Sequence, residues 1–312
     1  MLTLNFETIT PLHISNGNQL AYNLEYTIFN GDLAKLNIEA HKKIAEAKLF
    51  DYKRNYKFYE IIKIIEQNKN IFNDSCFDYR IETVPAFDEF LRNERRDGQK
   101  IVQEFVNSNG NFYVPGSSVK GMLTTILHRD PQKNPLGISP ETPSIDDKFV
   151  ITDSDYIPSE SFIVDIAYRP PSVNLIVLDA GQTFNCKVKK TGNMDLEDLK
   201  KKLSFYSFEQ LQKARAIVNK FKEKERKPGG ATQYFNFLEN FMNGLKLNDD
   251  EYLVNLGFGG GSYYKLYNDA KIPKFKNPGR RNREEEAHTT FSVNIENEFY
   301  QLGWCKLTIE EE

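Results

Sequence analysis

A turn from strand to helix at residues 113–121 constrains the fold of this chain more than any other segment. It reads Tyr-Val-Pro-Gly-Ser-Ser-Val-Lys-Gly. Pro115-Gly116 breaks an apolar run that ends at Val114, and Ser117 and Ser118 are both residue types that cap helices. Apolar residues then recur with the spacing of one helix face at Val119, Met122, Leu123, Ile126 and Leu127. The segment predicts a strand that leads directly into a helix.

Two residues in the first turns of this helix are unfavourable there. Lys120 places a cation where the helix dipole favours an anion. Gly121 costs about 1 kcal/mol relative to alanine inside a helix. Both are explained if an anion lies on the helix N-terminus and a ligand backbone passes close by. The alternative is an ordinary turn with a solvated lysine, and the spacing alone leaves both interpretations open.

Length and charge limit the classes of function. The 312 residues are enough for two domains of ordinary size. The net charge of −3 excludes a globally basic nucleic-acid binder, so an anionic partner must meet a local patch. No run of 18 apolar residues is present and residues 1–7 alternate like a strand. We therefore expect no membrane span, no signal peptide and a cytoplasmic location.

The cysteines and histidines give no pattern for a metal or a cofactor. Cys76, Cys186 and Cys305 are far apart and odd in number, which argues against a disulfide framework and a zinc site. The histidines form no ligand spacing, so neither metal nor cofactor is expected. His13 lies in a loop after the first predicted strand. A lone loop histidine is more often structural than catalytic, and no paired acid or base can be named for it.

Periodicity predicts a chain of mixed strands and helices. Asn30-Gly31 predicts a tight hairpin, and residues 107–110 predict a second one. The predicted strands cover residues 2–8, 24–28, 36–38, 148–152, 162–168, 174–178, 183–189, 289–295 and 302–309, and the predicted helices cover 41–70, 196–227 and 234–244. Ile101, Phe105 and Phe112 lie in the two strands that flank the predicted turn at 107–110. Hairpins imply antiparallel pairing, which favours an α+β fold of two βαββαβ domains over a doubly wound sheet. The expected domains are residues 1–168, with a helical insert, and residues 169–312. Prolines mark residues 129–144 as a loop insert.

A glycine run and a basic stretch are further candidate sites. Gly257, Gly259, Gly260 and Gly261 surround Phe258, and their unobstructed N–H groups suit a phosphate cradle. The run lacks the Lys-Ser/Thr of a P-loop, which argues against a nucleotide hydrolase. Residues 265–283 are basic, include Arg280 and Arg281, and are interleaved with Tyr267 and Phe275, a pattern that suits contact with a nucleic-acid backbone. A surface loop for the first segment and a solvated loop for the second remain the alternatives.

Four segments together resemble the RAMP superfamily of CRISPR-associated proteins. They are Thr-Pro-Leu-His-Ile-Ser-Asn-Gly at 10–17, Val-Pro-Gly-Ser-Ser-Val-Lys-Gly at 114–121, Leu-Gly-Phe-Gly-Gly-Gly at 256–261 and Gln-Leu-Gly-Trp-Cys-Lys at 301–306. Their order and spacing are most similar to the fifth Csm subunit of type III-A effector complexes. The Pro-Gly-Ser-Ser-x-Lys-Gly signature is shared by several RAMP subunits, so it identifies the superfamily better than the subunit.

The resemblance implies ferredoxin-like (RRM-like) domains and a non-catalytic RNA-binding subunit at the 3′ end of the crRNA. It also implies a role in crRNA maturation and complex assembly. The implied partners are crRNA, the backbone RAMP subunit and the small helical subunit. The expected RNA-binding residues are His13, Gly116, Ser117, Ser118, Lys120, Gly121, Gly257, Phe258, Gly259, Gly260, Gly261, Arg280 and Arg281.

Two alternatives remain on sequence grounds. The first is a metal-independent RAMP endoribonuclease that processes repeat RNA, with His13 as general base and Lys120 as cationic stabiliser. The second is an equivalent RAMP subunit of a type III-B complex.

Overall fold

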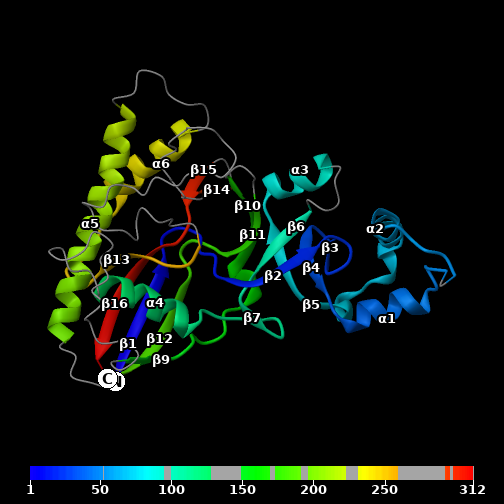
Figure 1. The fold of residues 1–312 in the computed structure, drawn as a ribbon, viewed down its shortest axis with the longest axis horizontal. Helices are drawn as coiled ribbons and strands as arrows, with labels where there is room; N and C mark the ends of the chain where they lie inside the picture. Colours follow the sequence, from blue (N-terminus) through cyan, green and yellow to red (C-terminus); the bar gives the residue numbers. More distant parts are fainter. Residues whose placement is uncertain are drawn as a thin grey trace, which may run out of the picture.

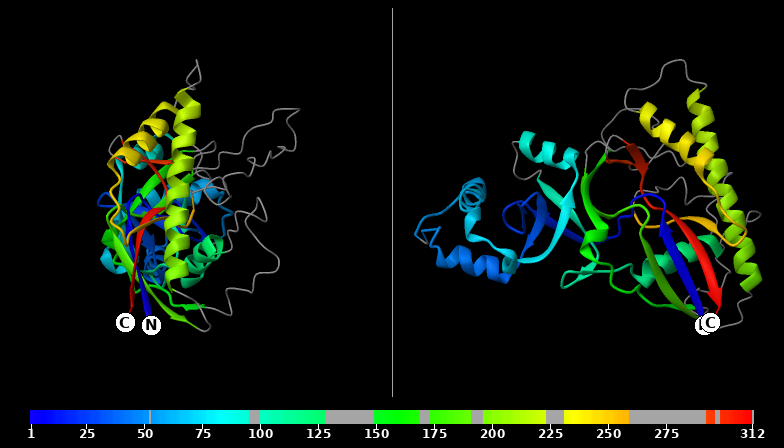
Figure 2. Two further views of the ribbon diagram at one scale, coloured as in Figure 1. Left: turned by 90° about the vertical axis from the view of Figure 1, so that its left-hand side faces the viewer. Right: turned by 180° about the vertical axis from the view of Figure 1, so that it is seen from behind.

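The computed structural model describes residues 1–51, 53–94, 100–127, 149–168, 173–190, 196–222, 231–258, 292–295 and 298–311. These residues form an α+β fold with two main sheets (Figure 1). Helices α5 (Leu196–Lys222) and α6 (Ala231–Gly244) lie at one end of the elongated molecule. Helices α1 (Ile38–Glu46) and α2 (Phe58–Gln67) lie at the other end, as the reverse view also shows (Figure 2). No described helix is long and apolar enough to cross a membrane.

The five-stranded sheet has the order β13-β16-β1-β12-β9, with antiparallel neighbours throughout. Its strands are β1 (Leu2–Thr8), β9 (Phe149–Ile151), β12 (Thr183–Lys190), β13 (Tyr252–Asn255) and β16 (Trp304–Glu311). Burial alternates along β1, so Leu2, Leu4 and Phe6 enter the core. The same core contains Val119, Leu123 and Ile126 of α4 (Gly116–Leu127). The order β16-β1-β12-β9, with α4 before β9 and α5 after β12, is that of a βαββαβ unit.

The nine-stranded sheet has the main order β2-β6-β11-β10-β5-β4-β3, and β14 and β15 extend it from β10. Its strands are β2 (Ser15–Ala21), β3 (Tyr26–Phe29), β4 (Asp32–Leu36), β5 (Phe77–Thr83), β6 (Ile101–Phe105), β10 (Phe162–Tyr168), β11 (Val173–Leu178), β14 (Ser292–Ile295) and β15 (Glu298–Gln301). Two of its pairs, β10–β5 and β11–β6, are parallel. The sheet curls so far that Lys35 on β4 reaches Glu104 on β6, with a distance of 2.6 Å between Nζ and Oε1.

The remaining described elements are short. Helix α3 (Pro85–Asn93) begins with a proline at its first position and buries Phe87. Strands β7 (Asn107–Ser108) and β8 (Asn111–Phe112) form a separate hairpin. Single 3₁₀ turns occur at Lys69–Ile71, Asp74–Cys76 and Ser159–Ser161.

Both predicted hairpin turns are confirmed. Asn30 and Gly31 have φ values of 54° and 92°, and they join β3 to β4. Asn109 and Gly110 have φ values of 52° and 80°, and they join β7 to β8. Such paired positive φ values are those of a type I′ turn, which Asn-Gly adopts at little cost. Strand β10 occupies the predicted residues 162–168.

Other boundaries differ from the predictions. The predicted helix at 41–70 is two helices. Helix α1 begins earlier than predicted, because Asn37 caps it by accepting hydrogen bonds from the N–H groups of Glu39 and Ala40. It ends before Lys48, because Lys48 has a positive φ of 50°. Residues from both expected domains, 1–168 and 169–312, contribute to each sheet. The hairpin β10–β11 spans residue 168, and the division into domains at 1–168 and 169–312 stays a prediction.

Candidate functional site

Three of the four segments singled out in the sequence bond to one another and form one unit, called here the motif junction. It consists of residues 10–13, 256–258 and 302–304. The N–H of Phe258 donates to the carbonyl of His13 at 2.7 Å, and the N–H of Leu256 donates to the carbonyl of Gly303 at 2.8 Å. The N–H of Trp304 donates to Thr10 Oγ1 at 2.9 Å. Three segments that are far apart in the sequence are therefore held together by hydrogen bonds that involve their backbone groups.

Two glycines make this close approach possible. Gly257 has a φ of +72°, and a Cβ there would overlap the carbonyl oxygen of His13. Gly303 has a φ of +88°, and a Cβ there would overlap the carbonyl oxygen of Leu256. Positive φ and the lack of space both exclude larger residues. Packing within the motif junction thus requires a glycine at 257, and the phosphate cradle suggested by the sequence stays a prediction.

His13 is buried at the centre of the junction, with 1% of its surface exposed. Its Nδ1 lies 2.7 Å from the carbonyl oxygen of Ile176, so this nitrogen carries the proton and donates. The ring makes edge contacts with Phe105 and with the half-exposed Phe258. Burial lowers the pKa of His13 to about 4, against a smaller opposing effect of the hydrogen bond to Ile176. The imidazole is therefore neutral near pH 7 and positions the junction loops.

The start of α4 differs from the prediction. The helix begins at Gly116, and the N–H groups of Ser118 and Val119 donate to the carbonyl of Pro115, so neither Ser117 nor Ser118 is the cap residue. The N–H of Gly116 donates to Asp153 Oδ1 at 2.8 Å. A carboxylate of this chain already lies on the helix N-terminus, where a negative charge is stabilised. Asp153 thus lies near the point where the sequence suggested an external anion, and the RNA-binding role of the residues at the start of α4 stays a prediction.

Gly116 and Gly121 have opposite surroundings. A Cβ at Gly116 would overlap the carbonyl oxygen of Ile151 and lie 2.6 Å from that of Thr152, so this glycine permits contact between α4 and the end of β9. A Cβ at Gly121 would meet nothing within 4 Å, and the residue is exposed. Gly116 is required by packing, whereas Gly121 leaves open space beside the helix.

That open space is part of a cavity of about 300 Å³ between α4 and the motif junction. The cavity brings the fourth sequence segment next to the other three. Its lining comes from α4, α5, the end of β13 and the first residues of the glycine run: Ser118, Gly121, Met122, Thr125, Tyr206, Asn255, Leu256 and Gly257. Ser117 and Lys120 are on the same helix but are not part of the lining; Ser117 is exposed and Lys120 is half-buried.

Asn255 is the most unusual residue of this lining. It is 6% exposed, and its Nδ2 donates a long hydrogen bond of 3.4 Å to the carbonyl of Leu302. Its Oδ1 has no hydrogen-bond partner within the described part of the chain. A buried amide oxygen without a donor costs on the order of 1–3 kcal/mol, so this position lowers the stability of the fold.

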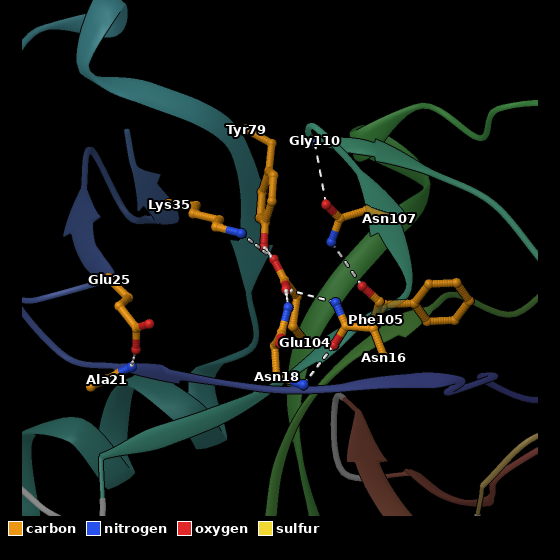
Figure 3. Close-up of polar contacts among 10 residues, drawn as sticks. All are labelled: Asn16, Asn18, Ala21, Glu25, Lys35, Tyr79, Glu104, Phe105, Asn107 and Gly110. Atoms are coloured by element: carbon orange, nitrogen blue, oxygen red, sulfur yellow. Dashed lines mark hydrogen bonds and ion pairs between the residues drawn. The ribbon is translucent and has the colours of Figure 1, made fainter. Parts of the chain in front are cut away.

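A second buried polar group lies inside the curl of the nine-stranded sheet (Figure 3). The carboxylate of Glu104 accepts hydrogen bonds from Lys35 at 2.6 Å, Tyr79 at 2.7 Å, Asn16 at 2.8 Å and Asn18 at 3.0 Å. Burial alone would raise the pKa of Glu104, but these four hydrogen bonds lower it to about 2. Asn16 belongs to the first sequence segment, so one role of that segment is to hold β2 against this carboxylate.

The other predicted site residues are placed as follows. Gly259, Gly260, Gly261, Arg280 and Arg281 lie outside the described residues, as do the basic stretch 265–283 and the insert 129–144. Cys76, Cys186 and Cys305 are buried free thiols. The described residues contain no group of three or more side chains arranged to hold a metal ion.

Sequence reasoning missed Asp153, Tyr206, Asn255 and Glu104. Asp153 follows β9 and acts on a helix that begins 37 residues earlier, so no local spacing reveals it. Tyr206 and Asn255 come from an ordinary helix and an ordinary strand end. For Glu104 a signal existed: it is a carboxylate within a strand whose neighbours Val102 and Phe105 are apolar and buried.

Comparison with known proteins gives a family and a fold. The family model of the RAMP superfamily matches residues 5–264. A chain of a cryo-EM structure of a Csm–crRNA–target RNA ternary complex from a type III-A CRISPR-Cas system superposes with a TM-score of 0.66 at 13% identity, over 98% of this chain and 100% of that chain. Csm5 of T. onnurineus superposes with a TM-score of 0.53 at 13% identity, over 82% of this chain and 90% of that chain. No curated protein sequence matches. At this identity the two structures show a shared fold.

Proposed function

We propose, from the premise that this chain belongs to the RAMP superfamily, that it is a non-catalytic RNA-binding subunit of a type III-A CRISPR effector complex. In this proposal it corresponds to the fifth Csm subunit. It lies at the 3′ end of the crRNA, contacts the backbone RAMP subunit and the small helical subunit, and is needed for crRNA maturation and complex assembly.

The observation that carries this proposal is the likeness over the full length of both chains to a subunit of a Csm–crRNA–target RNA complex. The likeness to Csm5 of T. onnurineus, over most of both chains, favours the fifth subunit among the RAMP subunits. The βαββαβ order of the five-stranded sheet supports the expected ferredoxin-like plan for one domain. A second ferredoxin-like domain remains part of the proposal.

The proposed RNA contact is the surface where α4 meets the motif junction. Ser117, Lys120, Gly121 and Phe258 are exposed or half-exposed there. His13, Gly116 and Gly257 shape this surface from within, because the first is buried and the two glycines are packed against backbone. Gly259, Gly260, Gly261, Arg280 and Arg281 stay in the proposal as RNA-binding residues on sequence grounds.

The endoribonuclease alternative is less well supported. A general base works best with a pKa near the working pH, whereas burial holds the pKa of His13 at about 4. A ring that is 1% exposed also offers no path to a 2′-hydroxyl without opening of the junction. The equivalent subunit of a type III-B complex is distinguished by its partners, since the fold is common to the superfamily.

The test is reconstitution of the type III-A complex with and without this chain, followed by measurement of subunit composition and crRNA length. We expect the complete complex to carry mature crRNA, and the complex without this chain to carry longer crRNA or to assemble poorly. Normal assembly and normal crRNA length without this chain would refute the proposal. Specific cleavage of repeat RNA by the isolated chain in EDTA, lost in His13→Gln, would favour the endoribonuclease instead.

A further inference from the structure

The outer face of α5 carries two aromatic side chains that are exposed to solvent. Phe205 and Phe208 are 45% and 59% exposed, and because they are three positions apart their rings lie on the same face of the helix. Helix α5 lies at one end of the molecule and is seen in front of the other elements when viewed from that end (Figure 2). Its inner face is buried through residues such as Leu203 and Ala214. The helix is therefore anchored without the two phenylalanines.

No other helix in the described part of the chain presents such a pair. Phe58 and Tyr59 are the only other exposed large apolar residues that share a helix there, and residues adjacent in sequence do not face each other on a helix. Single apolar residues are normal on a protein surface, whereas adjoining exposed apolar side chains mark a contact surface. The pair on α5 therefore indicates a place where another molecule binds.

Polar residues continue this face of α5 on both sides of the aromatic pair. Lys201, Phe205, Phe208, Gln212 and Arg215 follow one another at intervals of four and three residues, the spacing of a seam between two helices. At a rise of 1.5 Å per residue, this seam is about 21 Å long. Lys201 and Arg215 are exposed, and neither forms an ion pair with another described residue. The seam thus has an apolar centre and a cation towards each end.

We propose that the seam of α5 docks an amphipathic helix of a neighbouring protein subunit, with aliphatic side chains at its centre and a carboxylate towards each end. This inference rests on the proposed function, because the neighbour belongs to the same effector complex. An apolar row with this spacing packs along a second helix. The rings of Phe205 and Phe208 supply most of the contact area, and carboxylates complement the charges of Lys201 and Arg215.

Two other occupants fit the charges of the seam less well. In a symmetric contact between two antiparallel copies of α5, Lys201 of each copy would face Arg215 of the other, and this repulsion opposes self-association. An RNA strand would bring phosphates to the start of the seam, where Asp198 lies three positions before Lys201 with 57% of its side chain exposed. That carboxylate repels a phosphate backbone. The charge pattern therefore favours a protein helix over a second copy and over RNA.

The first test is photo-cross-linking in the reconstituted complex with crRNA. The variant Phe208→p-benzoylphenylalanine is irradiated in the assembled complex, and the cross-linked partner is identified by mass spectrometry. We expect a cross-link to a segment of another subunit that has apolar residues at helical spacing and carboxylates on the same face. The control is Tyr156→p-benzoylphenylalanine, because Tyr156 is 66% exposed and lies between β9 and β10. The control should not react with that segment.

The second test measures how much of this chain is needed to fill the complex. The double variant Phe205→Ala/Phe208→Ala should raise the concentration for half-maximal incorporation about ten-fold or more, since truncated aromatic anchors dominate losses at interfaces. The matched control, Phe58→Ala/Tyr59→Ala, removes two exposed rings that do not share a face. It should stay close to wild type. Arg215→Glu should weaken incorporation, whereas Arg215→Lys should retain it.

The outcomes separate the docking proposal from the proposed function. If complexes carry crRNA of normal length, then a cross-link from position 208 to RNA or to a second copy, or no cross-link there, refutes the docked helix while the function stands. Equal incorporation of the two double variants refutes it as well. Melting temperatures of the isolated variants report whether they fold, and the cross-linking result decides where they do not. If the wild-type chain does not enter the complex, the proposed function fails and the docking proposal fails with it.

Discussion

Glu104 and Asn255 are two buried polar residues whose hydrogen-bonding groups are satisfied to opposite extents. Glu104 accepts four hydrogen bonds from three neighbouring strands and is completely buried. Asn255, at the end of β13, keeps an amide oxygen without a partner among the described residues, next to a cavity. A buried polar group whose hydrogen bonds are all made stabilises the fold, whereas a buried polar group without a partner costs stability. The comparison separates a stabilising polar network from a position that lowers the stability of the chain.

The largest loss of stability should come from removing the carboxylate of Glu104, which accepts four hydrogen bonds. Glu104→Ala would leave the ammonium of Lys35 and the hydroxyl of Tyr79 without their acceptor, in a place where little water can replace it. Breaking a buried pair of this kind costs about 3–5 kcal/mol of unfolding free energy. Denaturant unfolding at pH 7 measures this. Glu25→Ala is the matched control, since Glu25 lies in the turn between β2 and β3 and its carboxylate accepts one exposed hydrogen bond from the N–H of Ala21. Equal loss in both variants would remove the distinction drawn for Glu104.

The second effect concerns His13 and pH. Its folded pKa of about 4 lies below the ordinary value of 6.5, so the unfolded chain binds a proton in this range before the folded chain does. The stabilising contribution is complete above pH 6.5 and is lost as the pH falls towards 4, for a total of about 3 kcal/mol. Unfolding curves between pH 7 and pH 4 should therefore be flatter for His13→Gln than for wild type.

The exposed His41 provides the control for this titration, because it lies on α1 far from the motif junction. The variant His41→Gln is the control for the removal of a histidine outside the junction. If His13→Gln and wild type lose stability in parallel between pH 6.5 and pH 4, then the ring is not buried in its neutral form and the junction is more open than described.

The third effect tests whether the glycine at 257 serves packing. Gly257→Ala would place a Cβ onto the carbonyl oxygen of His13 in a backbone conformation that L-residues disfavour by 1–2 kcal/mol. We expect a loss of about 2 kcal/mol or more in unfolding free energy for the isolated chain, in the absence of RNA. A Gly257→Ala chain with unchanged melting temperature that fails to retain crRNA would instead make this glycine a direct RNA contact.

The smallest effect should be a gain in stability, whereas the other substitutions lower it. Gly121→Ala adds a methyl group where nothing lies within 4 Å, in the middle of α4, so it should stabilise the chain by up to about 1 kcal/mol. The same methyl group narrows the cavity, so crRNA retention should weaken slightly or stay constant as the melting temperature rises. A fall in melting temperature would mean that the space beside Gly121 is filled in the folded protein.

Sequence patterns predicted local features well and long-range ones poorly. The turns at Asn30-Gly31 and Asn109-Gly110 are confirmed because the residues that adopt positive φ are themselves the signal. Strand β5 was missed although Phe77, Tyr79, Ile81 and Thr83 alternate with exposed or half-exposed residues. That alternation was a usable signal. No sequence pattern predicts that Thr10, Gly303 and Leu256 lie close together, because their contact depends on the order of strands in the five-stranded sheet.

In the candidate site, too, local features were predicted and long-range contacts were not. The four segments were recognised by their residues, and α4 was predicted from its apolar face. Ser118 was assigned the role of cap because Ser is a common cap residue, but Asp153 from another strand end occupies the helix N-terminus. The cavity was not predictable, since it depends on how far α4 stands from Leu256 and Gly257 after the core is packed.

The position of β1 in the five-stranded sheet has a consequence for how the chain is made. Its two neighbours, β12 and β16, follow it in the sequence by most of the length of the chain. During synthesis, the apolar residues Leu2, Leu4 and Phe6 leave the ribosome long before either partner strand exists, and such delayed pairing slows folding. A nascent chain in this state exposes an unpaired apolar strand that can associate with other chains. We therefore expect this protein to depend on chaperones or on slow, cool expression, and chains interrupted before β16 to aggregate.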